Sequence, residues 1–258
     1  MLYRAAVASL LAFATVHGTA QAAAPVADYS VQFNSQFDAA AHPELGLVNA
    51  NVTPDGLQTH GFYNDQGIPS QITLDASSIL PSAGDYTIDL NFGGVAVTRW
   101  SVKLLDFANR TQDIGLYIDN HNINFYDYQG GSNMGSSPLI QDDTPFSVTF
   151  SRSSATNLVV GYINGVQQFS FLDNLGLAVF DPRQFYIFTD DVATPGSGGD
   201  AYESRAGVIK GINIYKTALS SSDVGSLHGV GVVPEPETWA LILSGLLTCA
   251  FVGQRRRG

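Results

Sequence analysis

Residues 158–166 read LVVGYINGV, and this stretch decides the fold. Leu158, Val160 and Tyr162 alternate along this stretch and share one parity. This is the pattern of a β-strand, whose successive side chains point to opposite faces. Asn164 and Gly165 follow, and Asn-Gly between two such runs is the strongest short-range signal for a two-residue hairpin turn. A second alternating run with Phe169 and Phe171 continues beyond the turn. The stretch therefore predicts two antiparallel strands joined by a tight turn.

The same period-two alternation recurs along most of the chain, as expected for half-buried strands. The runs that share one parity are Tyr29, Val31, Phe33 and Phe37; Tyr86, Ile88, Leu90 and Phe92; Trp100, Val102 and Leu104; Ile114, Leu116 and Ile118; Phe146, Val148 and Phe150; Phe185 and Ile187; and Val208, Ile212 and Ile214. Long helical patterns are absent from this part of the sequence. One short helix is predicted from Ser220 to Leu227, because Ser220 and Asp223 have the spacing of a capping box. Many short strands with regular turns predict an all-β domain over residues 23–228, a β-sandwich of jelly-roll type.

Two segments resemble a known family more closely than a generic β-sandwich would. They are the hairpin at 158–166 and the sequence GVIKGINIYKTALS at 207–220, which reads as a last strand leading into a short capped turn. Both are similar to laminin-G-like domains of the concanavalin A-like lectin and glucanase superfamily, and the resemblance covers about residues 100–227. It implies two packed antiparallel sheets and, in many relatives, a carbohydrate or protein ligand with calcium at the rim.

The N-terminus has the three parts of an export signal in the required order. Arg4 supplies the positive charge, residues 5–16 are apolar, and Ala20-Gln21-Ala22 forms a small-residue cleavage site. The apolar stretch is too short for a stable membrane anchor. We therefore expect a signal peptide over residues 1–22 and a mature chain that begins at Ala23.

The C-terminus also has three parts. A linker with Pro234, Glu235 and Pro236 spans residues 229–238, an apolar run spans 239–253, and a basic end at 254–258 contains Arg255, Arg256 and Arg257. The prolines cannot donate backbone hydrogen bonds and keep their neighbours extended, which suits a segment read by a protease. As a helix, the apolar run would be about 22 Å long, against about 30 Å of hydrocarbon in a bilayer. We expect a short transmembrane helix whose arginines stay on the cytoplasmic side.

This arrangement resembles the PEP-CTERM sorting signal of Gram-negative bacteria, on residues 233–257. The resemblance implies export across the inner membrane, transient anchoring there, and processing by the membrane enzyme exosortase. It further implies delivery to the cell surface or the extracellular space, because proteins with this tail are associated with biofilm and extracellular polysaccharide. The predicted partners are therefore exosortase and an extracellular polysaccharide or surface protein.

The charge balance of the chain excludes some partner classes. The sequence has 12 basic and 23 acidic residues, and four of the basic ones are Arg4 and Arg255 to Arg257 in the terminal segments. Such an acidic domain repels nucleic acid and anionic lipid, whereas calcium, neutral glycans and basic proteins remain possible ligands. The one cysteine, Cys249, lies in the apolar run. The predicted domain therefore has no disulfide and no cysteine-based metal site.

One group of acidic residues is a candidate calcium site. Asp190 and Asp191 end a predicted strand, and Asp200 and Glu203 lie beyond a glycine-rich loop. Clustered carboxylates and loop carbonyls can provide the six to eight oxygen ligands that calcium takes. Aspartates at such positions also stabilise turns through bonds to the backbone, and we prefer this second interpretation. Possible calcium is the only cofactor that the sequence suggests.

A sugar site would require aromatic side chains beside polar ones. The candidates are Tyr117, Asn120, His121, Tyr126 and Tyr128. The Asn120-His121 stretch reads as a polar turn first and as a ligand-binding edge second. Trp100 shares parity with Val102, so we expect it in the core.

Catalysis has little support in the sequence. Glycosidases use two carboxylates that flank the scissile bond, and the Glu-x-Asp-x-x-Glu strand motif typical of this superfamily is missing. Before the C-terminal tail the chain has only two glutamates, Glu44 and Glu203, on unrelated segments. We therefore expect a non-enzymatic, lectin-like binding protein. The alternatives are a glycan-cleaving enzyme and a structural biofilm or coat protein without a soluble ligand.

Overall fold

The computed structural model describes residues 23–61, 70–97, 101–128, 131–136, 140–180, 183–189, 203 and 205–230. The predicted signal peptide, the Pro-Glu-Pro motif, the apolar run 239–253 and the basic end lie outside these residues. So do Trp100 and three of the four predicted calcium ligands, Asp190, Asp191 and Asp200. Within the described ranges, no helix has both the length and the apolar character needed to cross a membrane.

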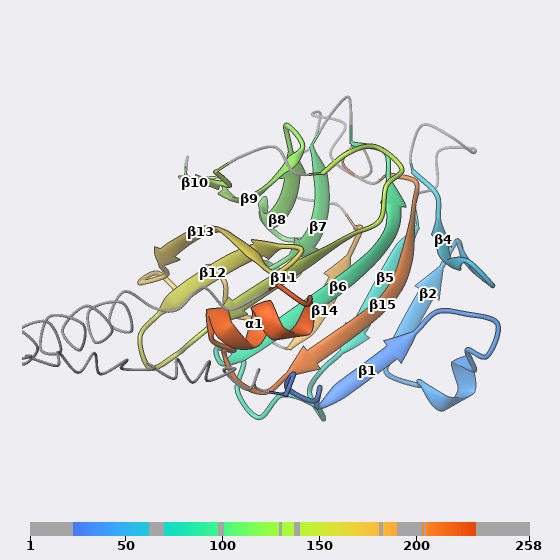
Figure 1. Ribbon diagram of the computed structural model, residues 1–258, viewed down its shortest axis with the longest axis horizontal. Helices are drawn as coiled ribbons and strands as arrows, with labels where there is room; N and C mark the ends of the chain where they lie inside the picture. Colours follow the sequence, from blue (N-terminus) through green and yellow to red (C-terminus); the bar gives the residue numbers. More distant parts are fainter. Residues whose placement is uncertain are drawn as a thin grey trace, which may run out of the picture.

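Two antiparallel sheets face each other across one hydrophobic core (Figure 1). The first is eight-stranded, with the order β13-β12-β11-β6-β15-β4-β3 and with β1 also paired to β15. Its strands are β1 (Tyr29–Gln32), β3 (Ala50–Thr53), β4 (Gly56–Thr59), β6 (Tyr86–Val95), β11 (Phe146–Arg152), β12 (Leu158–Ile163), β13 (Val166–Leu172) and β15 (Gly207–Tyr215). The second is seven-stranded, with the order β10-β9-β8-β7-β14-β5-β2. Its strands are β2 (Leu45–Val48), β5 (Gln71–Asp75), β7 (Val102–Asp106), β8 (Ile114–Asp119), β9 (Asn122–Asp127), β10 (Gly131–Met134) and β14 (Gln184–Ile187).

Aromatic rings from both sheets meet at the centre of the core. Phe150 of β11 is fully buried, and its ring stacks on Phe125 of β9 with 5.8 Å between the centroids. Phe107, just after β7, lies 5.2 Å from Phe150 and 4.3 Å from Phe180. Burial of such a side chain contributes about 2 to 3 kcal/mol. The all-β prediction is therefore confirmed.

Some members of the predicted alternating runs do not point where the pattern placed them. Leu158, Val160 and Tyr162 of β12 face away from the main core, to which β12 contributes Val159 and Ile163. Phe37 lies beyond the end of β1, ahead of a short 3₁₀ helix (Ala39–Ala41), but still packs against the core, with its ring 5.2 Å from Phe33. On β15 the core position is taken by Ile209, which is fully buried, whereas Val208 is only half-buried. The register shifts around Ile209, so the alternation restarts one residue later. Such bulges cannot be recognised from period-two parity.

The predicted hairpin and the predicted helix are both present. Asn164 and Gly165 connect β12 to β13 with φ values of 49° and 78°, as a two-residue hairpin turn requires. The helix α1 (Ser221–Leu227) begins with the capping box between Ser220 and Asp223. It lies on the outer side of the eight-stranded sheet (Figure 1), where Val224 packs against Val160 and Tyr162 of β12.

Candidate binding site

A small cavity opens on the outer side of the seven-stranded sheet, over β8 and β9. Alternation sends Leu116 and Phe125 into the core, so the residues next to them point outward. The cavity has a volume of about 220 Å³, and we name it the polar pocket. Its lining consists of Ser101, Asp113, Tyr117, Asp119, Asn124, Tyr126 and Glu203.

Two tyrosines form the aromatic part of the polar pocket. Tyr117 of β8 is 3% exposed, and its hydroxyl donates to Asp113 Oδ1 over 2.5 Å. Tyr126 of β9 meets the Tyr117 ring edge-on, with 6.1 Å between the centroids. Burial raises the pKa of Tyr126, and the nearby negative charges of Asp113, Asp127 and Glu203 raise it further. The phenol of Tyr126 therefore stays protonated and faces a negative environment.

A buried lysine supports the pocket from below. Lys103 of β7 is fully buried, with its Nζ 3.0 Å from Asp106 Oδ2 and 3.5 Å from Asp113 Oδ1. The same Nζ lies 5.4 Å from the centre of the Tyr117 ring. Burial raises the pKa of Asp106, although the Lys103 charge opposes this rise. Two carboxylates neutralise the Lys103 ammonium. Its positive charge therefore stabilises Asp113 and the Tyr117 ring beside it.

Two polar side chains of the pocket keep hydrogen-bonding capacity for a ligand. Asn124 is 5% exposed, and its Oδ1 accepts a hydrogen bond of 2.8 Å from Ser132 Oγ. Its amide nitrogen donates to no described residue. The Asp119 carboxylate likewise makes no hydrogen bond or ion pair with any residue in the described ranges. Glu203 is fixed at the rim, because its backbone carbonyl accepts a hydrogen bond from the Lys103 amide over 3.2 Å.

The structure brings some of the predicted sugar-site residues together and separates others. Tyr117 and Tyr126 line the polar pocket, as their candidacy required. Asn120 and His121 instead form the turn between β8 and β9, with φ values of 49° and 64°, and His121 Nδ1 lies 2.9 Å from the carbonyl oxygen of Ile140. Tyr128 is 49% exposed and lies past the end of β9, outside the pocket lining.

Sequence reasoning missed Ser101, Asp113, Asp119 and Asn124. A usable signal existed for two of them, because Asp119 shares parity with Tyr117 and Asn124 shares parity with Tyr126. Of the predicted calcium ligands, Glu203 alone is described, and it lines the polar pocket. Among the residues that the structure describes, no three histidine, cysteine, aspartate or glutamate side chains are grouped closely enough to hold a metal ion.

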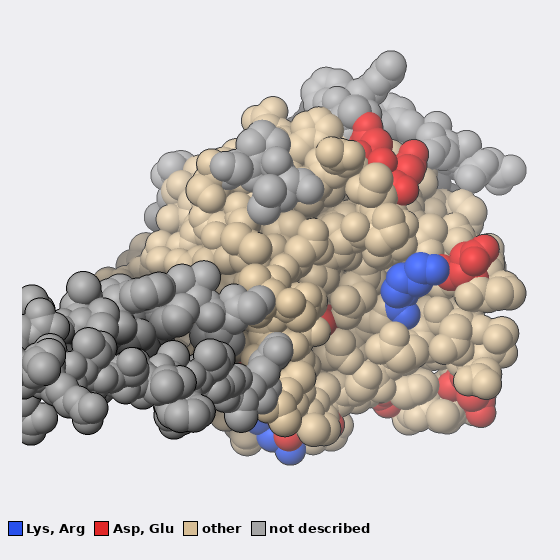
Figure 2. Space-filling model, in the orientation of Figure 1, with Lys and Arg blue, Asp and Glu red and all other residues tan. Residues whose placement is uncertain are grey.

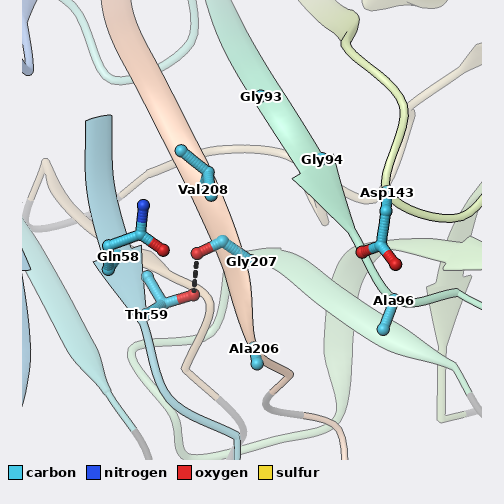
Figure 3. A pocket seen from close by; sticks show the side chains of 9 residues that line it. All are labelled: Gln58, Thr59, Gly93, Gly94, Ala96, Asp143, Ala206, Gly207 and Val208. Carbon is cyan, nitrogen blue, oxygen red and sulfur yellow. Dashed lines mark hydrogen bonds between the residues drawn. The ribbon is translucent and has the colours of Figure 1, made fainter. Parts of the chain in front are cut away.

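A second cavity of about 390 Å³ lies across the ends of β4, β15 and β6, and we name it the glycine cleft (Figure 3). Its lining consists of Gln58, Thr59, Gly93, Gly94, Ala96, Asp143, Ala206, Gly207 and Val208. Figure 3 shows the Gln58 and Asp143 side chains at opposite sides of the β15 and β6 backbones. A Cβ at Gly94 would lie 2.9 Å from the backbone carbonyl carbon of Asp143, and Gly94 has a φ of 155°, so the cleft depends on this glycine. Among the described residues, the lining has a single carboxylate and no aromatic ring.

Few charged side chains lie on the side of the molecule that carries α1. Figure 2 shows this side as a mostly uncharged surface with small, separate groups of acidic and basic side chains. The polar pocket differs, since three of its seven lining residues are acidic. Aromatic rings, an available amide and carboxylates therefore occur together in the polar pocket and not in the glycine cleft.

The comparisons with known proteins support the fold and nothing finer. No family profile and no curated protein matches the sequence. Among solved structures, a Trypanosoma rangeli sialidase in complex with the inhibitor DANA has a TM-score of 0.50 and 17% identity, over 71% of this chain and 29% of the sialidase chain. A botulinum neurotoxin serotype D binding domain has a TM-score of 0.48 and 13% identity, over 78% and 51%. The Ruminococcus gnavus IT-sialidase CBM40 has a TM-score of 0.47 and 11% identity, over 79% and 100%.

This chain thus spans about half of the toxin chain and less than a third of the sialidase chain. At these identities a likeness concerns backbone architecture only, and the two scores below 0.5 carry no weight. The sialidase match agrees with the two facing antiparallel sheets described above. The likeness therefore concerns the fold, two facing antiparallel β-sheets.

Proposed function

We propose that this chain is a carbohydrate-binding module and that the polar pocket holds the sugar. The observation that supports this most directly is the meeting of Tyr117, Tyr126 and Asn124 with carboxylates in one small cavity. Sugars present hydroxyl groups that both donate and accept, together with C–H faces that pack on aromatic rings. A site for them combines a few placed polar groups with aromatic surface.

The state of Asn124 strengthens this proposal. Asn124 lines the cavity, and among the described residues its amide nitrogen has no acceptor, whereas its Oδ1 is fixed by Ser132. This nitrogen can therefore donate a hydrogen bond to a ligand hydroxyl. We also propose that the two sheets form a jelly roll of the concanavalin A type, because β6, β11 and β15 are neighbours although they are distant in sequence.

The binding test uses a glycan array followed by calorimetry on the full chain and two variants. Asn124→Ala is expected to weaken binding at least about tenfold, which corresponds to about 1.4 kcal/mol from one lost hydrogen bond in a buried site. Gln58→Ala in the glycine cleft is the matched control, with an amide of similar chemistry removed from the other cavity. If Asn124→Ala binds as tightly as the unaltered chain, or if no glycan binds at all, the proposal is wrong.

A glycan-cleaving enzyme is the second candidate function, because Asp113, Asp119 and Glu203 line one pocket. Glycosidases need a carboxylic acid and a carboxylate about 5 to 9.5 Å apart on either side of the bond. Asp113 is already held by Tyr117 and Lys103, which favours binding over catalysis. Release of reducing ends from a glycan that binds, lost in Asp119→Asn, would instead establish the enzyme.

We propose that the domain is delivered by a sorting route that reads the C-terminal tail. The support is the order of Pro234-Glu235-Pro236, a short apolar run and three arginines. Replacement of Pro234 and Pro236 by alanine should leave a longer, membrane-retained product, which mass spectrometry of the cell fractions would detect. Glu237→Gln is the control, with the prolines intact. A processed mass that is the same in the double alanine variant contradicts this route.

A further inference from the structure

The polar pocket offers its ligand negative charge and no available positive charge. Asp113, Asp119 and Glu203 line it, and among its lining residues in the described ranges none is lysine, arginine or histidine. The lysine beneath it, Lys103, is fully buried and is paired with Asp106 at 3.0 Å. An anionic ligand would therefore meet like charges without a counter-charge, which is unfavourable in a partly buried site.

The pocket is also rich in acceptors, so it suits a ligand that donates hydrogen bonds. The Asp119 carboxylate makes no bond within the described ranges, and Asp113 uses one oxygen for Tyr117 and Lys103. Among the described lining residues, a donor that remains for a ligand is the amide nitrogen of Asn124, a residue that is 5% exposed. A complementary ligand thus has at least one hydroxyl for Asn124 and a group with several N–H donors for the carboxylates.

The volume of the polar pocket bears on the size of its ligand. The carboxylates line one cavity, yet no three acidic or histidine side chains in the described part of the chain are grouped as metal ligands. Negative charge spread around about 220 Å³ matches an organic cation of several atoms better than a single ion. A pyranose ring that bears an ammonium group has the required size and donors.

We propose that the polar pocket selects glycans with free amines, that is, sugars carrying an unacetylated ammonium group, over neutral and acidic glycans. The ammonium is held by Asp119 together with Asp113 or Glu203, and Asn124 and Tyr126 hold hydroxyls. This inference rests on the proposed carbohydrate-binding function and adds the chemical class of the sugar. The sialic acid named in one of the sialidase structures is an acid and is the class that this pocket would reject.

The test compares three oligosaccharides of equal length with the full chain by calorimetry. They are an oligomer of glucosamine, the same oligomer fully N-acetylated, and an oligomer of a uronic acid. At about pH 6 much of the glucosamine amine is protonated. We expect the glucosamine oligomer to bind at least about tenfold more tightly than the acetylated one, because a charge-assisted hydrogen bond replaces a neutral one. The uronic acid oligomer should show no binding.

Two variants separate this inference from the function on which it rests. Asp119→Asn should reduce the preference for amine over N-acetyl toward one, and Asp143→Asn, which removes the carboxylate of the glycine cleft, should leave the preference intact. Equal affinity for the amine and N-acetyl oligomers would overturn the inference while carbohydrate binding stands. Failure of all three oligomers and of the array would overturn both. Binding that requires added calcium and disappears with chelator would overturn the inference in favour of a metal-bridged sugar.

Discussion

At the scale of single residues, the buried ion pair of Lys103 has an energetic consequence for the seven-stranded sheet. Its ammonium is fully buried between Asp106 and Asp113, under the ring of Tyr117. Removing one partner of a buried ion pair leaves a charge without compensation, which is costly. Asp106 would be the abandoned charge.

We therefore expect Lys103→Met to lower the free energy of unfolding by about 3 to 5 kcal/mol, measured by urea denaturation at neutral pH. Lys216→Met is the matched control, since Lys216 pairs with Asp28 over 3.1 Å at the surface and should matter by less than about 1 kcal/mol. A loss below about 1 kcal/mol for Lys103→Met would show that the pair contributes nothing net.

At the residue scale, the sequence offered binding-site candidates where the signal was chemical and none where it depended on the environment of the side chain. Tyr117 and Tyr126 were recognised as candidates because aromatic residues stood beside polar ones. The burial of Lys103 was not predicted. Period-two alternation indicates that Lys103 points outward from the sheet, but it does not indicate that Tyr117 covers it. Burial of an outward-facing residue depends on contacts between strands, which one local segment does not encode.

At the scale of elements, the docking of α1 depends on a polar cluster at its C-terminal end. His228 follows the helix, with Nε2 3.0 Å from Asp89 Oδ1 on β6 and Nδ1 3.1 Å from Ser147 Oγ on β11. Thr149 Oγ1 donates to the same Asp89 oxygen over 2.8 Å. Ser147 is buried, and neither described cavity is lined by these residues, so the cluster serves to attach the helix.

This cluster makes part of the stability dependent on pH. Burial alone would raise the pKa of Asp89, but the hydrogen bonds and charge of His228, with bonds from Thr149 and Asn213, outweigh it and lower the pKa. A lowered carboxyl pKa stabilises the fold above the unfolded value of about 3.9, and this stabilisation is lost as pH falls through the native value.

Asp89→Asn should therefore cost about 2 kcal/mol at neutral pH and less at an acidic pH below the lowered native pKa of Asp89, where the carboxylate of the unaltered chain is protonated as well. Urea denaturation at the two pH values gives this difference. Asp143→Asn, which alters an exposed carboxylate, should have little effect at neutral pH. A cost for Asp89→Asn that is unchanged at acidic pH would contradict the role of its charge.

Elements with local signals were predicted, and those without were not. Asn164-Gly165 and the capping box at Ser220 carry their geometry in two to four residues, and both are present. The turn Asn120-His121 has the same two-residue form without glycine, and we read it only as a polar turn. Strands β2 to β5 were not predicted, because their residues show no long alternation.

At the scale of the whole molecule, the two sheets share one core, so we expect them to unfold together. Phe150 contacts Phe125, Phe107 and Phe169, which come from both sheets and their connections.

Phe150→Ala should lower the free energy of unfolding by about 3 to 5 kcal/mol. Fluorescence and circular dichroism should still report one coincident transition. Leu175→Ala is a surface control, since Leu175 is 78% exposed. Two separated transitions would mean that the sheets are independent.

The polar pocket could not be predicted at this scale because its parts come from distant segments. Asp113 precedes β8, Asn124 lies on β9, and Glu203 arrives some eighty residues later through a backbone bond to Lys103. The sequence supports the all-β class through repeated alternation, but the order of strands in a sheet is set by long-range packing. The fold brings these carboxylates together in one cavity.

The position of β15 has a consequence for how the protein is made. This strand is the last in the described part of the chain, yet it pairs with β6 on one side and with β1 and β4 on the other. While the ribosome has not yet released residues 207–215, β1 has no partner strand, and β4 has only β3. Loop closure over such sequence separations is slow, so the nascent polypeptide stays incompletely folded at least until residues 207–215 have been synthesised. A chain stopped just before β15 would expose the unpaired edges of β6 and β4 to aggregation.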